Sequence, residues 1–152
     1  MKPGMELGNA RLTERIIAAA IRVHKEIGPG FLEIMYEEAL AIELTSSGIT
    51  FERQKLLPIF YREYLIGEHR LDVLVEGSVI VELKAISALE DIHFAIARSY
   101  LKASNLADAL LLNFATARLT MKRVGREYHP KLENEERISS FPRFLVSRFI
   151  HG

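Results

Sequence analysis

Residues 71–84 read LDVLVEGSVIVELK, and this stretch decides the fold. Two runs dense in β-branched residues, 71–75 and 79–84, are joined by Glu76-Gly77-Ser78. Runs that are apolar on both faces are typical of strands covered from both sides. The stretch therefore predicts a central β-hairpin inside an α/β domain.

Two acidic residues interrupt these apolar runs, Asp72 in the first and Glu82 in the second. A carboxylate buried without a partner is costly, so its presence in a core strand needs a reason. The two-residue period of a strand places Glu82 and Lys84 on one face. With Glu76-Gly77-Ser78 as the loop, Asp72 lies directly across from Glu82 on that face.

Two carboxylates and an ammonium in one place suit phosphodiester hydrolysis. Paired carboxylates bind a hard divalent cation and leave several water positions open. Such a cation lowers the pKa of a bound water and neutralises charge on a phosphate, and a lysine can orient that water. From the residues alone, a buried ion pair of Lys84 with Asp72 or Glu82 is an equal alternative.

The flanking sequence predicts the rest of the domain. Apolar residues at helical steps, closed by glycine or asparagine, predict three helices, over 13–27, 32–46 and from the capping box Ser87–Glu90 to Ser104. Further strands are predicted over 49–56, 59–65, 107–114 and 119–124, with Pro58 separating the first two and Gly67-Glu68 as a turn.

Composition limits the class of protein. The 152 residues make one ordinary domain, with twenty basic and twenty acidic residues. The lack of cysteine excludes disulfides, thiolate nucleophiles and cysteine-ligated metal sites, and it fits a reducing cytoplasm. No apolar run approaches the ~20 residues that span a bilayer, and the N-terminus has no signal-peptide pattern. We expect a cytoplasmic protein with no membrane partner.

A family resemblance adds to this interpretation. Asp72, nine residues, then Glu82-Leu83-Lys84 resembles the PD-(D/E)XK nuclease motif. The heptapeptide GFLEIMY at 30–36 is similar to the G-x-x-E-x-x-Y signature of one small bacterial and archaeal family of that superfamily. Residues 100–104 and 110–114 resemble later segments of the same family, so the likeness covers about residues 12–124.

The resemblance implies a restriction-endonuclease-like core, in which a mixed sheet is flanked by helices and the central hairpin carries the active site. It implies a nuclease that uses Mg²⁺, with Mn²⁺ as the alternative ion. It implies that Asp72 and Glu82 are metal ligands, that the Leu83 carbonyl is a third ligand, and that Lys84 is the catalytic lysine. Glu33 becomes an additional acidic group near the metal, or else an exposed glutamate favoured by the helix dipole.

One position departs from the family pattern. A glutamine is expected one helical turn before Tyr100, where this chain has Ile96. That glutamine commonly borders the active site in related nucleases. Its loss leaves a second function class open: a catalytically inactive nuclease fold that serves as a nucleic-acid-binding or protein-assembly module. In such a scaffold, Lys84 would close an ion pair with the carboxylates.

A basic stretch suggests a nucleic-acid partner. From 98 to 126 there are six basic residues against one acid, and Lys102, Arg118, Lys122 and Arg123 are candidates to hold a phosphate backbone. Residues 1–126 are expected to form the nuclease-like domain, and 127–152 a polar linker and an amphipathic tail. The tail carries Phe141, Phe144, Leu145 and Phe149. Its predicted role is packing on the domain or docking on a partner, including a homodimer.

Overall fold

The computed structural model describes residues 9–126, and the predicted C-terminal tail lies outside this range. One mixed sheet has the strand order β1-β2-β3-β4-β5. Only β3 and β4 are parallel; the other neighbours are antiparallel. The strands are β1 (Phe51–Tyr61), β2 (Tyr64–Val75), β3 (Val79–Lys84), β4 (Asp108–Asn113) and β5 (Thr120–Gly125).

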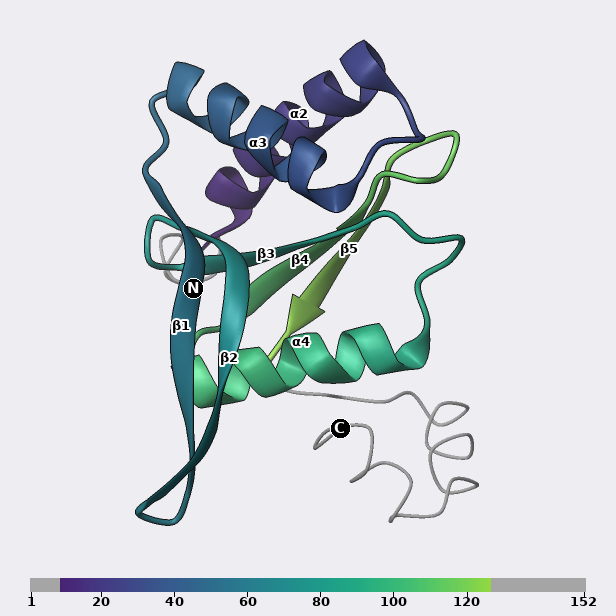
Figure 1. The fold of residues 1–152 in the computed structure, drawn as a ribbon. Coiled ribbons are helices and arrows are strands. Elements are labelled where there is room, and N and C mark those ends of the chain that lie inside the picture. Colours follow the sequence, from purple (N-terminus) through teal and green to yellow (C-terminus); the bar gives the residue numbers. More distant parts are fainter. Residues whose placement is uncertain (1–8, 127–152) are drawn as a thin grey trace.

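Three helices cover the two faces of this sheet (Figure 1). Helices α2 (Ala10–Ile27) and α3 (Glu33–Ser46) pack side by side on one face. Helix α4 (Asp91–Ser104) makes the crossover between the parallel strands β3 and β4 and covers the other face. The predicted α/β architecture, a mixed sheet flanked by helices, is confirmed. No helix among residues 9–126 is long and apolar enough to cross a bilayer.

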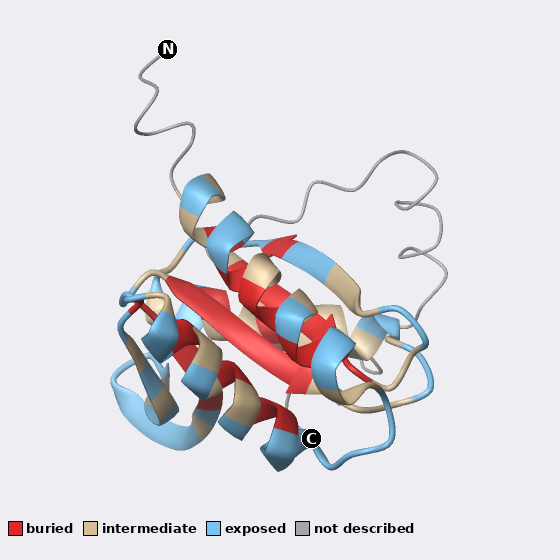
Figure 2. Ribbon diagram, turned by 90° about the horizontal axis from the view of Figure 1, so that it is seen from above, coloured by how far each residue is buried: buried red, intermediate tan, exposed pale blue. Residues whose placement is uncertain are grey.

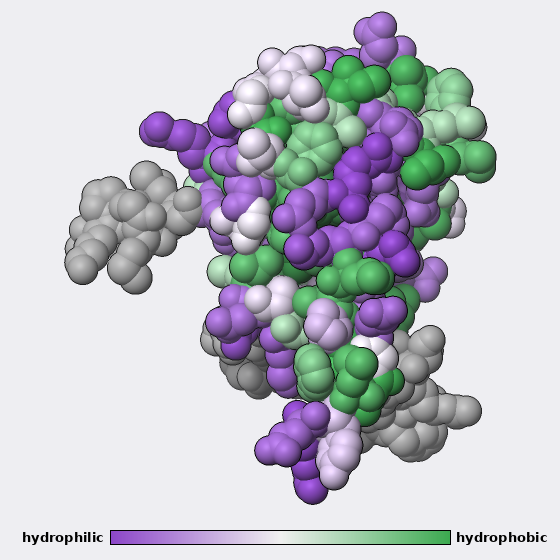
Figure 3. Space-filling view, turned by 60° about the vertical axis from the view of Figure 1, so that its left-hand side comes forward, coloured by the Kyte–Doolittle hydropathy of each residue, from purple (hydrophilic) through white to green (hydrophobic). Residues whose placement is uncertain are grey.

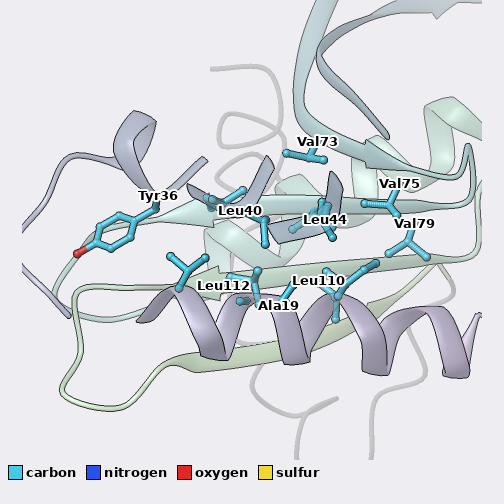
Figure 4. Close-up of a cluster of buried hydrophobic side chains, with 14 of the residues drawn as sticks. Ala19, Tyr36, Leu40, Leu44, Val73, Val75, Val79, Leu110 and Leu112 are labelled. Carbon is cyan, nitrogen blue, oxygen red and sulfur yellow. The ribbon is translucent and has the colours of Figure 1, made fainter. Parts of the chain in front are cut away.

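The core is divided by the sheet into two hydrophobic clusters. Residues of α2 and α3, with Tyr36, Leu40 and Leu44 among them, pack on alternate residues of the central strands (Figure 4). On the other face, Ala97 and Leu101 of α4 pack on the remaining strand residues. The central strands are therefore buried from both sides, as the apolar run at 71–84 predicts (Figure 2).

The edge of the sheet corrects one prediction. Pro58 does not separate two strands, because β1 runs through it to Tyr61 and the turn falls at Arg62 and Glu63. The predicted turn at Gly67-Glu68 is part of β2. A proline without a backbone N–H is tolerated here because β1 is the edge strand.

The start of α4 corrects a second prediction from the sequence. The helix begins at Asp91, later than the sequence predicts, and its capping box is formed by Glu90 and His93. The backbone N–H of Glu90 donates to Nδ1 of His93 at 2.8 Å. A histidine ring takes the place that glutamate or glutamine usually has in this motif.

The β1–β2 hairpin extends beyond the rest of the sheet (Figure 1). In the space-filling view this hairpin projects at the bottom, with hydrophobic side chains on its surface (Figure 3). The large apolar residues exposed on it are Leu56, Phe60, Tyr61, Tyr64, Leu65 and Ile66. The opposite end of β2 enters the core, and that end carries Asp72.

Candidate active site

The candidate site forms where β2 and β3 part. Main-chain pairing between these strands runs from Val75↔Val79 to Val73↔Val81. At the next position, the N–H of Asp72 donates to Oε1 of Glu82 at 3.2 Å. The N–H of Leu83 donates to Oδ2 of Asp72 at 2.9 Å. Each carboxylate thus accepts a main-chain N–H of the other strand, and the two acids meet across the hairpin.

The alternation of β2 changes at the same position. Val73 and Val75 pack in the cluster under α2 and α3. Leu71 has the same parity in the strand but packs in the cluster under α4. In a regular strand these residues would share a face. The alternation of β2 is therefore interrupted at Asp72, whose carboxylate accepts the N–H of Leu83 on β3.

Burial makes both carboxylates hard to ionise. Glu82 is 6% exposed. Burial, and next the charge of Asp72, raise the pKa of Glu82 to about 8. Burial also raises the pKa of Asp72, although the N–H of Leu83 opposes that shift. Two acids forced together without a compensating cation favour their neutral forms.

Helix α4 supplies one wall of the site through Tyr100. Burial, followed by the charges of Glu82 and Asp72, raises the pKa of Tyr100 to about 12. The ring of His69, on β2, lies 4.7 Å from the Tyr100 ring between centroids. Burial lowers the pKa of His69. Tyr100 and His69 thus form a largely neutral aromatic wall on this side.

Lys84 ends β3 on the same edge and is half-buried. Its charge lowers the pKa of both Asp72 and Glu82, though burial outweighs it. Among the ion pairs of residues 9–126, none joins Lys84 to either carboxylate. The closed ion pair that a scaffold would show is therefore not formed in the described part of the chain.

Glu33 reaches this edge from the first turn of α3. Its Oε2 accepts the N–H of Ala85, the residue after Lys84, at 3.3 Å. Its charge also contributes to the raised pKa of Asp72. The structure therefore places Glu33 beside the carboxylate pair, although it comes from a distant part of the chain.

Tyr36 holds the loop from which α3 starts. Its hydroxyl donates to the carbonyl of Gly28 at 2.6 Å and accepts the N–H of Phe31 at 3.2 Å. Its ring is fully buried and stacks on Phe114 with centroids 4.5 Å apart. Tyr36 is thus a packing residue whose hydroxyl fixes the turn that presents Glu33.

The residues present fit a hard cation. Asp72 and Glu82 supply carboxylate oxygens from two strands. The Leu83 carbonyl lies on the same side of β3 as its N–H, toward β2 and beyond the last paired residues. Within residues 9–126, no group of three or more His, Cys, Asp or Glu side chains could surround an ion. A cation would bind two carboxylates, a carbonyl and water, which is a donor set that hard divalent cations prefer.

A comparison with known families agrees with this geometry. The sequence model of the PD-(D/E)XK nuclease superfamily matches residues 10–124. The chain belongs to that superfamily. No curated protein and no solved structure gives a significant match.

Membership makes the architecture a PD-(D/E)XK core of restriction-endonuclease-like type. The matched range coincides with α2 to β5, so the superfamily accounts for nearly all described residues. Its members are nucleases that generally use divalent metals and act on nucleic acid. The predicted motif residues Asp72, Glu82 and Lys84 all lie within the matched range.

Ile96 is on α4, one turn before Tyr100, as predicted. Its carbonyl accepts the hydroxyl of Ser99 at 2.6 Å. An aliphatic side chain cannot donate to a substrate or a water, so α4 contributes no amide at this position of the PD-(D/E)XK site.

The four candidate nucleic-acid-binding residues are not gathered on one surface. Arg118 is exposed in the loop between β4 and β5, toward the end of the strands at which Lys84 and its sheet partner Asn113 lie. Lys102 is in the last turn of α4, toward the other end of the strands, where Arg126 bonds to Asn105. Lys122 and Arg123 are both exposed on the edge strand β5, and as neighbours in a strand they point to opposite faces of the sheet.

The sequence pattern did not indicate one acidic residue that lies near Asp72 and Glu82. Glu37 is 4% exposed, and its charge contributes to the raised pKa of Asp72. Its carboxylate accepts Nε of Arg53 at 2.8 Å and Nε2 of Gln54 at 2.7 Å. Its position four residues after Glu33, on the same helix face, was an available signal.

Proposed function

We propose that this PD-(D/E)XK protein is a divalent-metal-dependent nuclease that hydrolyses phosphodiester bonds in nucleic acid, and that it is of the G-x-x-E-x-x-Y type within the superfamily. The observation that carries this proposal lies at the fork of β2 and β3, which is the point beyond Val73 and Val81 where these two strands stop pairing. There the buried carboxylate of Glu82 and the half-buried carboxylate of Asp72 meet across the strands, each accepting an N–H of the other strand, and the lysine beside them is not ion-paired to either.

Asp72, Glu82 and the Leu83 carbonyl are the proposed ligands. A bound divalent cation supplies a water of lowered pKa and neutralises charge that develops on a phosphate. Burial and mutual repulsion raise the pKa of both acids, so the pair has a strong electrostatic reason to accept a cation. Mg²⁺ is the proposed ion and Mn²⁺ the alternative, since both prefer oxygen ligands.

Lys84 is the proposed catalytic lysine. Its ammonium lies at the carboxyl end of β3, where the charge acts on both carboxylates without being held by either. An ammonium in that position can donate to the attacking water or to a phosphate oxygen. Glu33 contributes negative charge beside the end of β3 that carries Lys84, where it accepts the N–H of Ala85.

Arg118 is the proposed phosphate-binding residue on the side of Lys84, since it alone among the four candidates lies toward that end of the strands. Lys102, Lys122 and Arg123 would then contact more distant parts of the nucleic acid. Arginine and lysine contacts to phosphates make binding weaken with salt.

Cleavage of labelled single- and double-stranded DNA and RNA, with Mg²⁺, Mn²⁺ or a chelator, tests the proposal. Wild-type protein is compared with Glu82→Gln and Lys84→Ala, which keep the fold because neither removes core hydrophobic volume. The proposal expects cutting that needs metal and is lost in both variants. Metal-independent cutting, or cutting that both variants retain, would contradict it.

A folded wild-type protein that cuts none of the four substrates would also count against the nuclease. Binding of the same nucleic acids without cleavage would then favour the inactive module, with Ile96 as the candidate defect. The variant Ile96→Gln restores the expected amide and is the matched test of that outcome.

A further inference from the structure

Gln54 has an unusual backbone conformation for its position. Its φ is +53°, in the left-handed region that residues with a Cβ rarely adopt. Of the other non-glycine residues with positive φ among 9–126, Arg62 and Glu76 lie at hairpin turns and Asn105 ends a helix. Gln54 lies inside a strand, where this conformation has a cost.

The irregularity is level with the candidate site. Pairing of β1 with β2 includes Arg53↔Val73 and Lys55↔Leu71 but omits the pair between them, Gln54 and Asp72. Asp72 is also the position where β2 leaves β3. The backbone of β1 is therefore distorted directly beside the first carboxylate.

The left-handed conformation lets two neighbouring side chains hold one carboxylate. Nε of Arg53 donates to Oε2 of Glu37 at 2.8 Å, and Nε2 of Gln54 donates to Oε1 at 2.7 Å. Successive residues of a regular strand point to opposite faces, so they could not both reach Glu37. The turn at Gln54 brings its amide to the same side as Arg53.

Glu37 connects this clamp to the site. It is buried on α3, one turn after Glu33, whose carboxylate accepts the N–H of Ala85 next to Lys84. The two bonds join α3 to β1 at the level where Asp72 faces Glu82. They therefore fix the position of α3, and with it Glu33, relative to the part of β1 that lies opposite Asp72.

We propose that Gln54 is a positioning residue of the metal centre, whose amide holds Glu37 and thereby fixes the backbone of β1 opposite Asp72, so that the Asp72 carboxylate stays on the N–H of Leu83. The inference rests on the proposed function, since it concerns the same carboxylates. It also gives the strained backbone a purpose: conformational energy at Gln54 is stored to place an amide that a regular strand could not present.

Three variants test the inference. Gln54→Gly accepts the left-handed backbone but removes the amide. Gln54→Glu keeps the length of the side chain and sets a second carboxylate against Glu37. Arg62→Gly is the matched control, because Arg62 has a φ of +55° at the far end of the same strand pair.

Two measurements separate positioning from general stability. Amide hydrogen exchange of Leu83 reports its bond to Asp72 without metal, and Leu111 in β4 serves as the internal reference. In both Gln54 variants, the backbone amide of Leu83 is expected to exchange about tenfold faster than in wild type, while the exchange rate of Leu111 is unchanged. Titration with Mn²⁺ alone is expected to show roughly tenfold weaker binding. Arg62→Gly should match wild type in both.

The outcomes are distinct. Wild-type exchange at Leu83 in Gln54→Gly overturns the inference, and so does equal acceleration at Leu83 and Leu111, which would show a general loss of stability. If wild-type protein binds no Mn²⁺, or if Asp72→Asn binds it equally well, the proposed metal site fails. In that case the Leu83 exchange alone still decides whether Gln54 orients Asp72.

Discussion

The two ends of strand β2 depart from ordinary protein design in opposite ways. At the inner end, Asp72 faces the buried Glu82, so acidic side chains occupy the interior. At the outer end, Tyr64, Leu65 and Ile66 are 73%, 64% and 54% exposed, so apolar groups occupy the surface. The same strand thus carries an acidic residue in the interior and apolar residues on the surface.

The difference lies in how each end is accommodated. Main-chain N–H groups, an aromatic wall and the Glu37 clamp surround the buried acids, so substitutions there should change chemistry more than folding. The apolar side chains at the hairpin end are exposed in the part of the chain that the structure describes. Substitutions at the hairpin end should therefore change neither the chemistry of the site nor the stability of the fold.

The largest expected effect is on cleavage, at the inner end. Asp72→Asn or Glu82→Gln should lower metal-dependent cleavage by at least about 100-fold, because a neutral amide binds a hard cation poorly. Initial rates with Mg²⁺ measure this. Tyr64→Ser, on the same strand but at the outer end, is the control and should cut at the wild-type rate. Equal loss in Tyr64→Ser would remove the distinction between the two ends.

The next effect is on pH dependence. The pKa of Glu82 is raised to about 8, so in metal-free native protein it binds a proton that the unfolded chain has released. Between the ordinary glutamate pKa and pH 8, stability therefore falls as pH rises, at up to about 1.4 kcal/mol per pH unit. Urea unfolding in chelator from pH 5 to 8 measures the slope.

Glu82→Gln sharpens that test, because it removes the titrating group and should flatten the slope. Saturating Mn²⁺ should also reduce it, since a ligand bound only to the native state opposes protonation of its own ligands. A wild-type stability that rises with pH over this window would contradict the raised pKa of Glu82.

A smaller effect is expected at the loop that presents Glu33. Tyr36→Phe keeps the stack on Phe114 but removes the hydroxyl that bonds to Gly28 and Phe31. Losing these bonds should lower the free energy of unfolding by roughly 1–3 kcal/mol. Urea titration measures the loss. An unchanged stability would show that the hydroxyl does not hold the turn.

The smallest effect is expected at the hairpin end. Leu65→Ser with Ile66→Ser should change the free energy of unfolding by no more than about 0.5 kcal/mol, because neither side chain is buried. Thermal unfolding in parallel with wild type measures it. A loss above about 2 kcal/mol would show that these residues pack against something, and the contrast between the two ends would disappear.

The parts of the site that follow local rules could be predicted from sequence. The apolar runs, the short loop and the strand period together require Asp72 to meet Glu82, and the structure has that register. The family resemblance, rather than any periodicity, brought Glu33 to the same place. Each of these predictions depends on pattern within a few residues or on a motif.

The rest depends on conformations that no pattern encodes. A left-handed glutamine within β1 brings Gln54 and Arg53 to one side, and no rule for strands predicts it. Pro58 reads as a break between strands, yet an edge strand can run through it. The basic residues cluster in sequence, but strand alternation and the length of α4 distribute them over different surfaces.

The irregular backbone of β1 has a consequence for solubility. An exposed sheet edge is a template on which other chains can add strands, and cross-β stacking uses uninterrupted segments of six or seven residues. In β1, Gln54 turns the backbone to a φ of +53° and Pro58 has no N–H to offer. The register of β1 also shifts between Ile59 and Phe60, so no uninterrupted segment of six residues remains in this strand. The feature that presents an amide to Glu37 thus also helps to protect this edge of the described sheet from aggregation.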